Sequence, residues 1–142
     1  MEYKVDKEID LSEYKIGNYI ISSQHRKKSN PNKSIWTITY KEEVECFIFA
    51  FDKKWNTDNE GWGLKIYDGL IQEIGQDFEY KKLKIAKFVD GNQKNVWHGY
   101  PVDHMIKPND RPTTEILKAW VDKGYLTKAK MCKIKQGKSC NL

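Results

Sequence analysis

Residues 35–51 read IWTITYKEEVECFIFAF, and this stretch decides the fold that the sequence predicts. Residues 35–40 alternate between large apolar side chains and threonines, which is typical of a half-buried strand. Residues 44–51 are apolar on both faces of an extended chain, as in a central strand that is covered on both sides. The short charged connection between the two runs favours a β-hairpin.

The rest of the chain places strands before helices. Three further strands are expected over residues 14–22, 62–67 and 80–89. A helix is expected over residues 114–123, after the capping residue Thr113, and a second one after Thr127. Strands followed by helices define the α+β class. We therefore expect a mainly antiparallel, twisted sheet of four to six strands, with a C-terminal helical hairpin packed on one face.

A chain of 142 residues predicts a single domain. Within it, residues 1–96 are expected to be mainly β and residues 113–142 to form a basic helical hairpin. The connection between them, residues 97–112, contains three of the four prolines. Since proline fixes φ and lacks an N–H donor, this segment predicts an ordered loop without regular structure. Long ordered loops often carry function.

The C-terminal thirty residues carry the net charge of the chain. Residues 113–142 contain seven lysines against Glu115 and Asp122, a net charge of +5 that equals the formal charge of the whole chain. A localised positive field attracts anionic partners such as nucleic acid or an acidic protein. Lysine outnumbers arginine 23 to 2, and this weakens a nucleic-acid role, because arginine is the better bidentate reader of phosphates and base edges.

The 97–112 segment also holds candidate catalytic side chains. His98 and His104 flank Asp103, and Lys107 and Arg111 follow. A histidine that titrates near neutral pH, a carboxylate that orients it and a cation that stabilises negative charge are the parts of a metal-independent ribonuclease. One hypothesis is therefore a nuclease that uses His98, His104 and Arg111, with Asp103 as the orienting carboxylate. The alternative is structural: His98 and Asp103 bind backbone groups that the prolines leave free.

The favoured hypothesis is a small, soluble, non-enzymatic binding protein with an anionic ligand: nucleic acid, a nucleotide or an acidic protein. The residues expected to contact the ligand are Trp97, His98, Tyr100, Lys107, Arg111, Lys128, Lys130 and Lys133. Small chains of this kind often act in bacterial or phage conflict systems, which is an association and not an inference from residues. A protein-interaction or immunity module with an apolar docking patch is the third hypothesis, and a homo-oligomer is compatible with the sequence.

No cofactor and no metal are expected. The chain lacks both G-x-x-x-x-G-K-[ST] and G-x-G-x-x-G. His98, Asp103 and His104 match a catalytic metal set in type but in none of the usual spacings. The three cysteines form no C-x-x-C pair. The N-terminus does not resemble a signal peptide, and no apolar stretch approaches the ~20 residues of a membrane span, so no membrane association and a cytoplasmic location are expected.

Two minor features complete the candidates. Residues 25–28, HRKK, would add to a basic surface if they lay near the C-terminal helices. Residues 55–62, WNTDNEGW, offer oxygen ligands that do not match the calcium-binding EF-hand pattern. A polar loop is the simpler interpretation of residues 55–62, although exposed tryptophans there would be able to stack on a base or a sugar.

Overall fold

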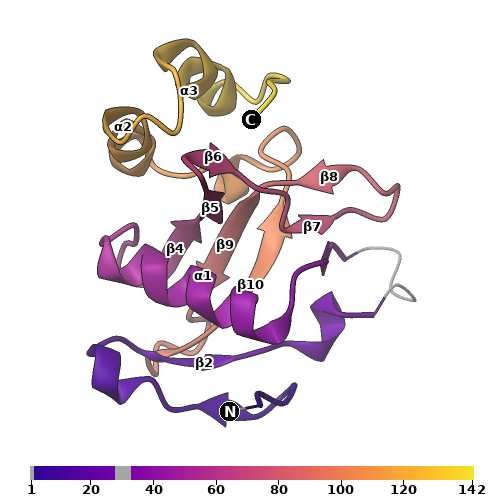
Figure 1. Ribbon diagram of the computed structural model, residues 1–142, viewed down its shortest axis with the longest axis vertical. Coiled ribbons are helices and arrows are strands. Elements are labelled where there is room, and N and C mark those ends of the chain that lie inside the picture. The colour runs from indigo at the N-terminus through magenta and orange to yellow at the C-terminus, as the bar shows by residue number, and fades with distance from the viewer. Residues whose placement is uncertain (1, 28–32) are drawn as a thin grey trace.

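A five-stranded sheet lies at the centre of the computed structural model, which describes residues 2–27 and 33–142 (Figure 1). The helices are α1 (Tyr40–Asp52), α2 (Thr114–Asp122) and α3 (Lys128–Lys135), with single 3₁₀ turns η1 (Ser12–Tyr14), η2 (Ser23–His25) and η3 (Pro108–Asp110). The strands are β1 (Glu8–Ile9), β2 (Asn18–Ile20), β3 (Ile35–Trp36), β4 (Glu60–Gly63), β5 (Ile66–Tyr67), β6 (Leu70–Ile71), β7 (Gly75–Gln76), β8 (Lys82–Leu83), β9 (Ile85–Val89) and β10 (Val96–Val102).

The central sheet is mixed and not purely antiparallel, because one of its strand pairs is parallel. Its strand order is β1-β2-β10-β9-β4. β2 and β10 run parallel, with Tyr19 opposite Trp97, whereas the other neighbours are antiparallel. A second sheet, β3-β7-β8, and the β5–β6 hairpin are both antiparallel. The expected mixture of α and β structure with helices at the C-terminus is confirmed, and the expected orientation of the strands is corrected at β2.

The predicted β-hairpin over residues 35–51 is wrong, because Tyr40–Asp52 forms helix α1. Only Ile35–Trp36 of that stretch is a strand. Residues 46–51 are apolar at every position, so their pattern fits a buried helix as well as a buried strand. A capping box decides between the two: the Thr39 side chain accepts from the Glu42 N–H, and the Glu42 carboxylate accepts from the Thr39 N–H.

Helix α1 lies across one face of the central sheet (Figure 1). Phe47 is fully buried, and its ring packs against those of Tyr19 and Phe88, at centroid distances of 4.7 and 5.3 Å. Gly63 on β4 permits the close approach, because a Cβ there would lie 3.3 Å from the Cβ of Ala50 on the helix. The apolar face of α1 and this face of the sheet therefore form the core.

The predicted 97–112 loop is wrong in its first half, where Val96–Val102 forms strand β10. Strand β10 tolerates Pro101 because the parallel pairing with β2 does not extend to this residue. Among the described residues that pairing covers only Val96 and Trp97, and at Pro101 the neighbouring strand is β9. Ser34 Oγ donates to the Pro101 carbonyl at 2.6 Å. The irregular connection is therefore limited to residues 103–113, and it contains η3.

Both predicted C-terminal helices are confirmed. Thr113 and Thr127 cap them by accepting from backbone N–H groups three residues later. Gly124 and Gly137 follow the helices with positive φ values of 81° and 70°. The helices lie beyond one end of the central sheet, and α1, not this pair, covers its face (Figure 1). Trp120 of α2 meets Trp55 edge to face at 5.7 Å.

Within the described part of the chain, no helix has both the length and the apolar character that crossing a membrane requires.

Replacing Thr39 with alanine should lower the free energy of unfolding by about 1 kcal/mol, because it removes the side-chain acceptor of the α1 capping box. Thr39→Ser keeps the hydroxyl and should retain most of the stability. Urea unfolding followed by far-UV circular dichroism measures both. An alanine variant as stable as the parent would show that the cap contributes nothing to α1.

Candidate functional site

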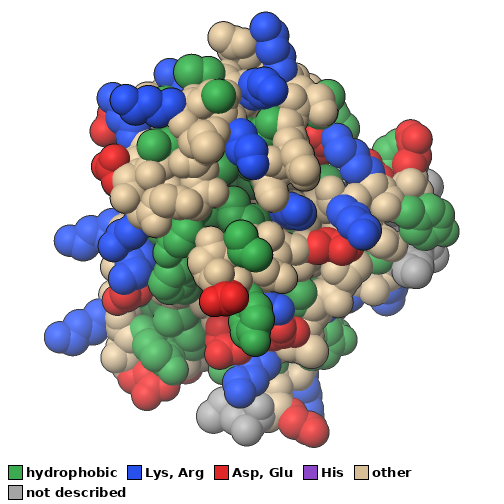
Figure 2. Space-filling model, turned by 45° about the horizontal axis from the view of Figure 1, so that its top comes forward, with side chains coloured by type: hydrophobic (Ala, Val, Ile, Leu, Met, Phe, Trp, Pro, Cys, Tyr) green, Lys and Arg blue, Asp and Glu red, His purple; other side chains and the backbone are tan. Residues whose placement is uncertain are grey.

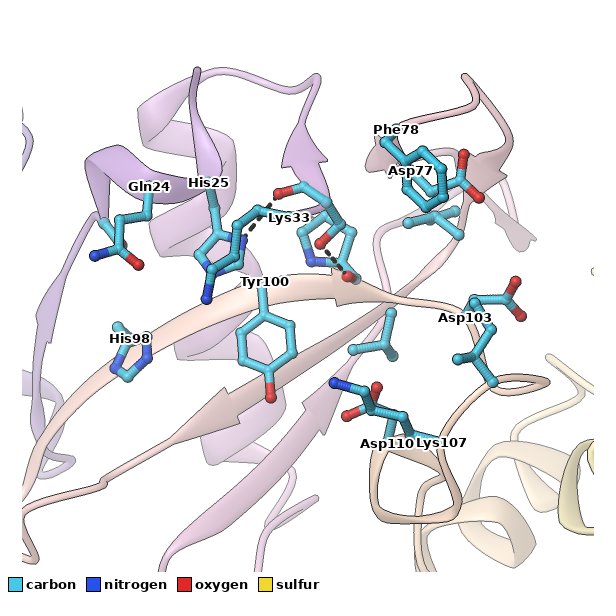
Figure 3. Close-up of a pocket in the computed structure, with 16 residues that line it drawn as sticks. Gln24, His25, Lys33, Asp77, Phe78, His98, Tyr100, Asp103, Lys107 and Asp110 are labelled. Carbon is cyan, nitrogen blue, oxygen red and sulfur yellow. Dashed lines mark hydrogen bonds between the residues drawn. The ribbon is translucent and has the colours of Figure 1, made fainter. Parts of the chain in front are cut away.

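A cleft of about 400 Å³ lies on the sheet face away from α1. Side chains alternate along β10: Trp97 packs against Phe51 of α1 at 4.6 Å, whereas His98 and Tyr100 point to the opposite face and line the cleft. An arm comprising the described residues 22–27 and 33–34 borders one side of the cleft, and the connection over residues 103–110 borders the other. The cleft therefore joins segments that are far apart in the sequence (Figure 3).

His25 enters the cleft from η2 in the arm. Its ring stacks on that of Tyr100, with centroids 5.0 Å apart and an interplanar angle of 16°. His25 Nδ1 lies 2.9 Å from the carbonyl oxygen of Ser34. A carbonyl only accepts hydrogen bonds, so Nδ1 carries the proton in the neutral ring and Nε2 keeps its lone pair. Burial lowers the pKa of His25, which favours this neutral form.

His98 and Lys33 stand beside His25 at the same end of the cleft (Figure 3). The ring of His98 lies 6.5 Å from that of Tyr100. Burial lowers the pKa of His98, and the positive charge of Lys33 lowers it further. We call Gln24, His25, Lys33 and His98 the histidine end of the cleft. It contributes donors and one fixed cation, and no carboxylate belongs to it among the described lining residues.

Three carboxylates lie at the opposite end of the cleft, and each has a structural partner (Figure 3). Asp103 is 2.7 Å from Lys81 Nζ. Asp110 is 3.6 Å from Lys87 Nζ, and that ammonium also donates to the Asn109 carbonyl at 2.6 Å. Asp77 accepts from two backbone N–H groups of its own turn. The two ends of the cleft therefore differ in charge.

Apolar side chains stand exposed beside the carboxylates. Phe78 and Ile106 both line the cleft, and they are 59% and 64% exposed. An exposed aromatic ring in a cleft is a surface on which a planar ligand stacks.

A buried ion pair holds the arm in place. Arg26 Nη2 lies 2.6 Å from Glu43 Oε1 in the first turn of α1. Arg26 also donates to the carbonyls of Ile38 and Thr39. The hydroxyl of Tyr19 on β2 donates to the second oxygen of Glu43. Because Arg26 follows His25 directly, these contacts fix the position of His25 over β10.

The cleft contains four of the sequence-predicted site residues: His98, Tyr100, Asp103 and Lys107. His104 and Arg111 lie elsewhere. His104 Nε2 is 2.8 Å from the carbonyl of Lys138, and Arg111 Nε donates to the His104 carbonyl at 2.8 Å. The Arg111 guanidinium packs on Gly137. The two residues hold the segment that follows α3, and the structure does not bring them to His98.

The remaining predicted contacts lie outside the cleft lining. Trp97 is 3% exposed and packs in the core. Lys128, Lys130 and Lys133 belong to α3 and do not line the cleft. Figure 2, in which the end of the molecule bearing α2 and α3 comes forward, shows Lys and Arg side chains interspersed with other types.

The structure places the two minor features of the sequence, residues 55–62 and residues 25–28, in different surroundings. Trp55 and Trp62 are buried, so neither of them is available for stacking on a ligand. Of the HRKK run, His25 and Arg26 belong to the arm, and Lys28 lies outside the described residues. From the sequence, His25 was expected to have only a minor role, and Lys33 was not expected to belong to the site. The one indication in the sequence that the arm contributes to the site was its basic character, because the arm and His98 are far apart in the chain.

No cluster of three or more His, Cys, Asp or Glu side chains that could hold a metal ion occurs in the described ranges. Comparison of the chain with protein-family models, with curated proteins and with solved structures finds no match. The chemistry of the cleft residues is therefore the basis for assigning a function.

The pH dependence of stability should report the buried state of Glu43. Burial raises the pKa of Glu43 to about 7, against 4.5 in the unfolded chain, although Tyr19 and Arg26 oppose the shift. The stabilising contribution is complete below pH 4.5 and is lost as the pH rises to 7, because the unfolded chain ionises first. Relative to Glu43→Gln, the parent should therefore become less stable as the pH rises over this range.

Urea unfolding of both proteins at several pH values measures this difference, and effects of groups common to both proteins cancel. Unfolding free energies that change in parallel would show that the Arg26 ion pair outweighs burial and keeps Glu43 ionised.

Proposed function

We propose that the chain binds a phosphate-bearing ligand, a nucleotide unit or a nucleic-acid strand, at the histidine end of the cleft. The supporting observation is the convergence of His25, Lys33 and His98 in a recess whose carboxylates all lie at the other end. The Lys33 ammonium forms charge-assisted hydrogen bonds to phosphate oxygens. A neutral His98 ring keeps one N–H to donate, and His25 donates from Nε2 when its ring is protonated. The ring of Tyr100 lies between the two ends of the cleft, and its phenol stays protonated because burial raises its pKa to about 12.

The size and the apolar surface of the cleft favour a nucleotide over other anions. A volume of about 400 Å³ falls in the range of small-molecule sites, roughly 300–1,000 Å³. Phe78 presents an exposed ring on which a base would stack, and the Asp77 side chain beside it offers acceptors. A ligand with phosphate at one end and a base at the other matches both ends of the cleft.

The basic helices have a smaller role in this proposal than the sequence indicated. Lys128, Lys130 and Lys133 contribute to long-range attraction of an anion, which salt screens, and the cleft supplies the specific contacts. A cytoplasmic location stays a prediction.

Isothermal titration in EDTA with adenosine 5′-monophosphate and with adenosine tests the proposal. The monophosphate should bind at least tenfold more tightly than adenosine. Lys33→Ala should weaken the monophosphate by about tenfold, which corresponds to about 1.4 kcal/mol for one charged contact, and should leave adenosine unchanged.

The matched control is a triple variant, Lys128→Ala, Lys130→Ala and Lys133→Ala, which removes more charge outside the cleft. It should bind the monophosphate as the parent does at 0.15 M salt. A loss in the triple variant without a loss in Lys33→Ala would place the anion on α3 instead. No binding of either ligand by the parent would contradict the proposal and favour a protein partner.

A further inference from the structure

A second hollow continues the cleft beyond the histidine end. It has a volume of about 530 Å³ and extends to residues 91–94 and to Asp6. Ser22, Gln24 and His98 line both hollows. His98 therefore stands between two recesses, one leading to Phe78 and the other leading to the 91–94 turn.

A recess on each side of His98 fits a phosphodiester better than a terminal phosphate. A mononucleotide has one nucleoside and fills one recess, whereas a phosphate inside a strand carries a nucleoside on each side. The charged groups in the two hollows also favour a phosphodiester beside His98. Lys33 stands in the first hollow and Lys94 in the second, and the Asp6 carboxylate of the second hollow accepts from the Ser23 N–H.

The hydrogen bond of His25 suits this ring to the role of a proton acceptor. The hydrogen bond from His25 Nδ1 to Ser34 leaves Nε2 as a proton acceptor. His98 lines the cleft at the junction of the hollows, beside the place proposed for the phosphate. We infer that the cleft cleaves single-stranded RNA without a metal ion, with His25 as general base and His98 as general acid. This inference rests on the phosphate binding proposed above.

The reaction is a transesterification within the strand. His25 Nε2 takes the proton of the ribose 2′-hydroxyl, and the 2′-oxygen attacks the adjacent phosphorus. The bond from phosphorus to the 5′-oxygen breaks, and protonated His98 gives its proton to that oxygen. The products are a 2′,3′-cyclic phosphate and a free 5′-hydroxyl. Water then opens the cyclic phosphate: His98 takes the proton of the water, and His25 returns its proton to the 2′-oxygen.

Lys33 stabilises the negative charge that builds on the non-bridging oxygens during the attack, because its ammonium stands beside both rings. The substrate is RNA and not DNA, because DNA lacks the 2′-hydroxyl that acts as the nucleophile. It is single-stranded because a base has to leave its neighbours to stack on Phe78.

The experiment uses the full chain with a 5′-labelled single-stranded RNA and a DNA of the same sequence, both in EDTA. The RNA should be cleaved, and its fragments should end first in 2′,3′-cyclic phosphate and later in 3′-phosphate. The DNA should bind and stay intact. His25→Ala and His98→Ala should each lower the cleavage rate at least a hundredfold, which is the usual contribution of one acid or base, and melting curves verify their folding.

The third histidine of the chain supplies the matched control. His104→Gln keeps a side-chain nitrogen for the Lys138 carbonyl and lies outside the cleft lining, so it should cleave RNA at the parent rate. Intact RNA at concentrations where the DNA binds would overturn the nuclease inference and leave phosphate binding in place. Binding of neither strand would overturn both. Cleavage that survives in His25→Ala or His98→Ala would also overturn the inference, since it would come from other groups.

Discussion

The buried contact between Arg26 and Glu43 is the interaction on which the arrangement of the molecule depends. Glu43 sits in the first turn of α1, receives a hydrogen bond from Tyr19 of the central sheet, and pairs with the arm that carries His25. A single carboxylate thus joins the helix, the sheet and one wall of the cleft. Removing one partner would leave the charge of the other unpaired in a buried position, which is costly in a low-dielectric interior.

The C-terminal helices were predictable and α1 was not, for physical reasons that particular residues show. Helices α2 and α3 begin at threonines that cap them. The residues that start each helix are therefore close together in the sequence. Residues 46–51 of α1 are apolar at every position, so this half of the helix shows no helical periodicity in the sequence. The signal that remained was Thr39 followed by Glu42, which the aromatic run 47–51 outweighed.

Part of the candidate site was likewise predictable from the sequence, and part of it was not. His98, Tyr100, Asp103 and Lys107 were found because β10 and the connection after it place neighbours in sequence on one side of the cleft. His25 and Lys33 come from more than sixty residues earlier, and only the fold brings them to His98. His104 and Arg111 match the expected pattern, a histidine and a cation near a carboxylate, but their hydrogen bonds to backbone carbonyls give them a structural role.

The parallel pairing of β2 with β10 has a consequence for the order in which the chain folds. Tyr19 and Trp97 are neighbours in the sheet although 77 residues separate them in the sequence, and contacts of such separation form slowly. During synthesis the N-terminal strands emerge first and have no partner for their inner edge until residues 96–97 leave the ribosome. The arm follows β2 and the 103–110 connection follows β10, so the cleft between them is assembled only when most of the chain has been made.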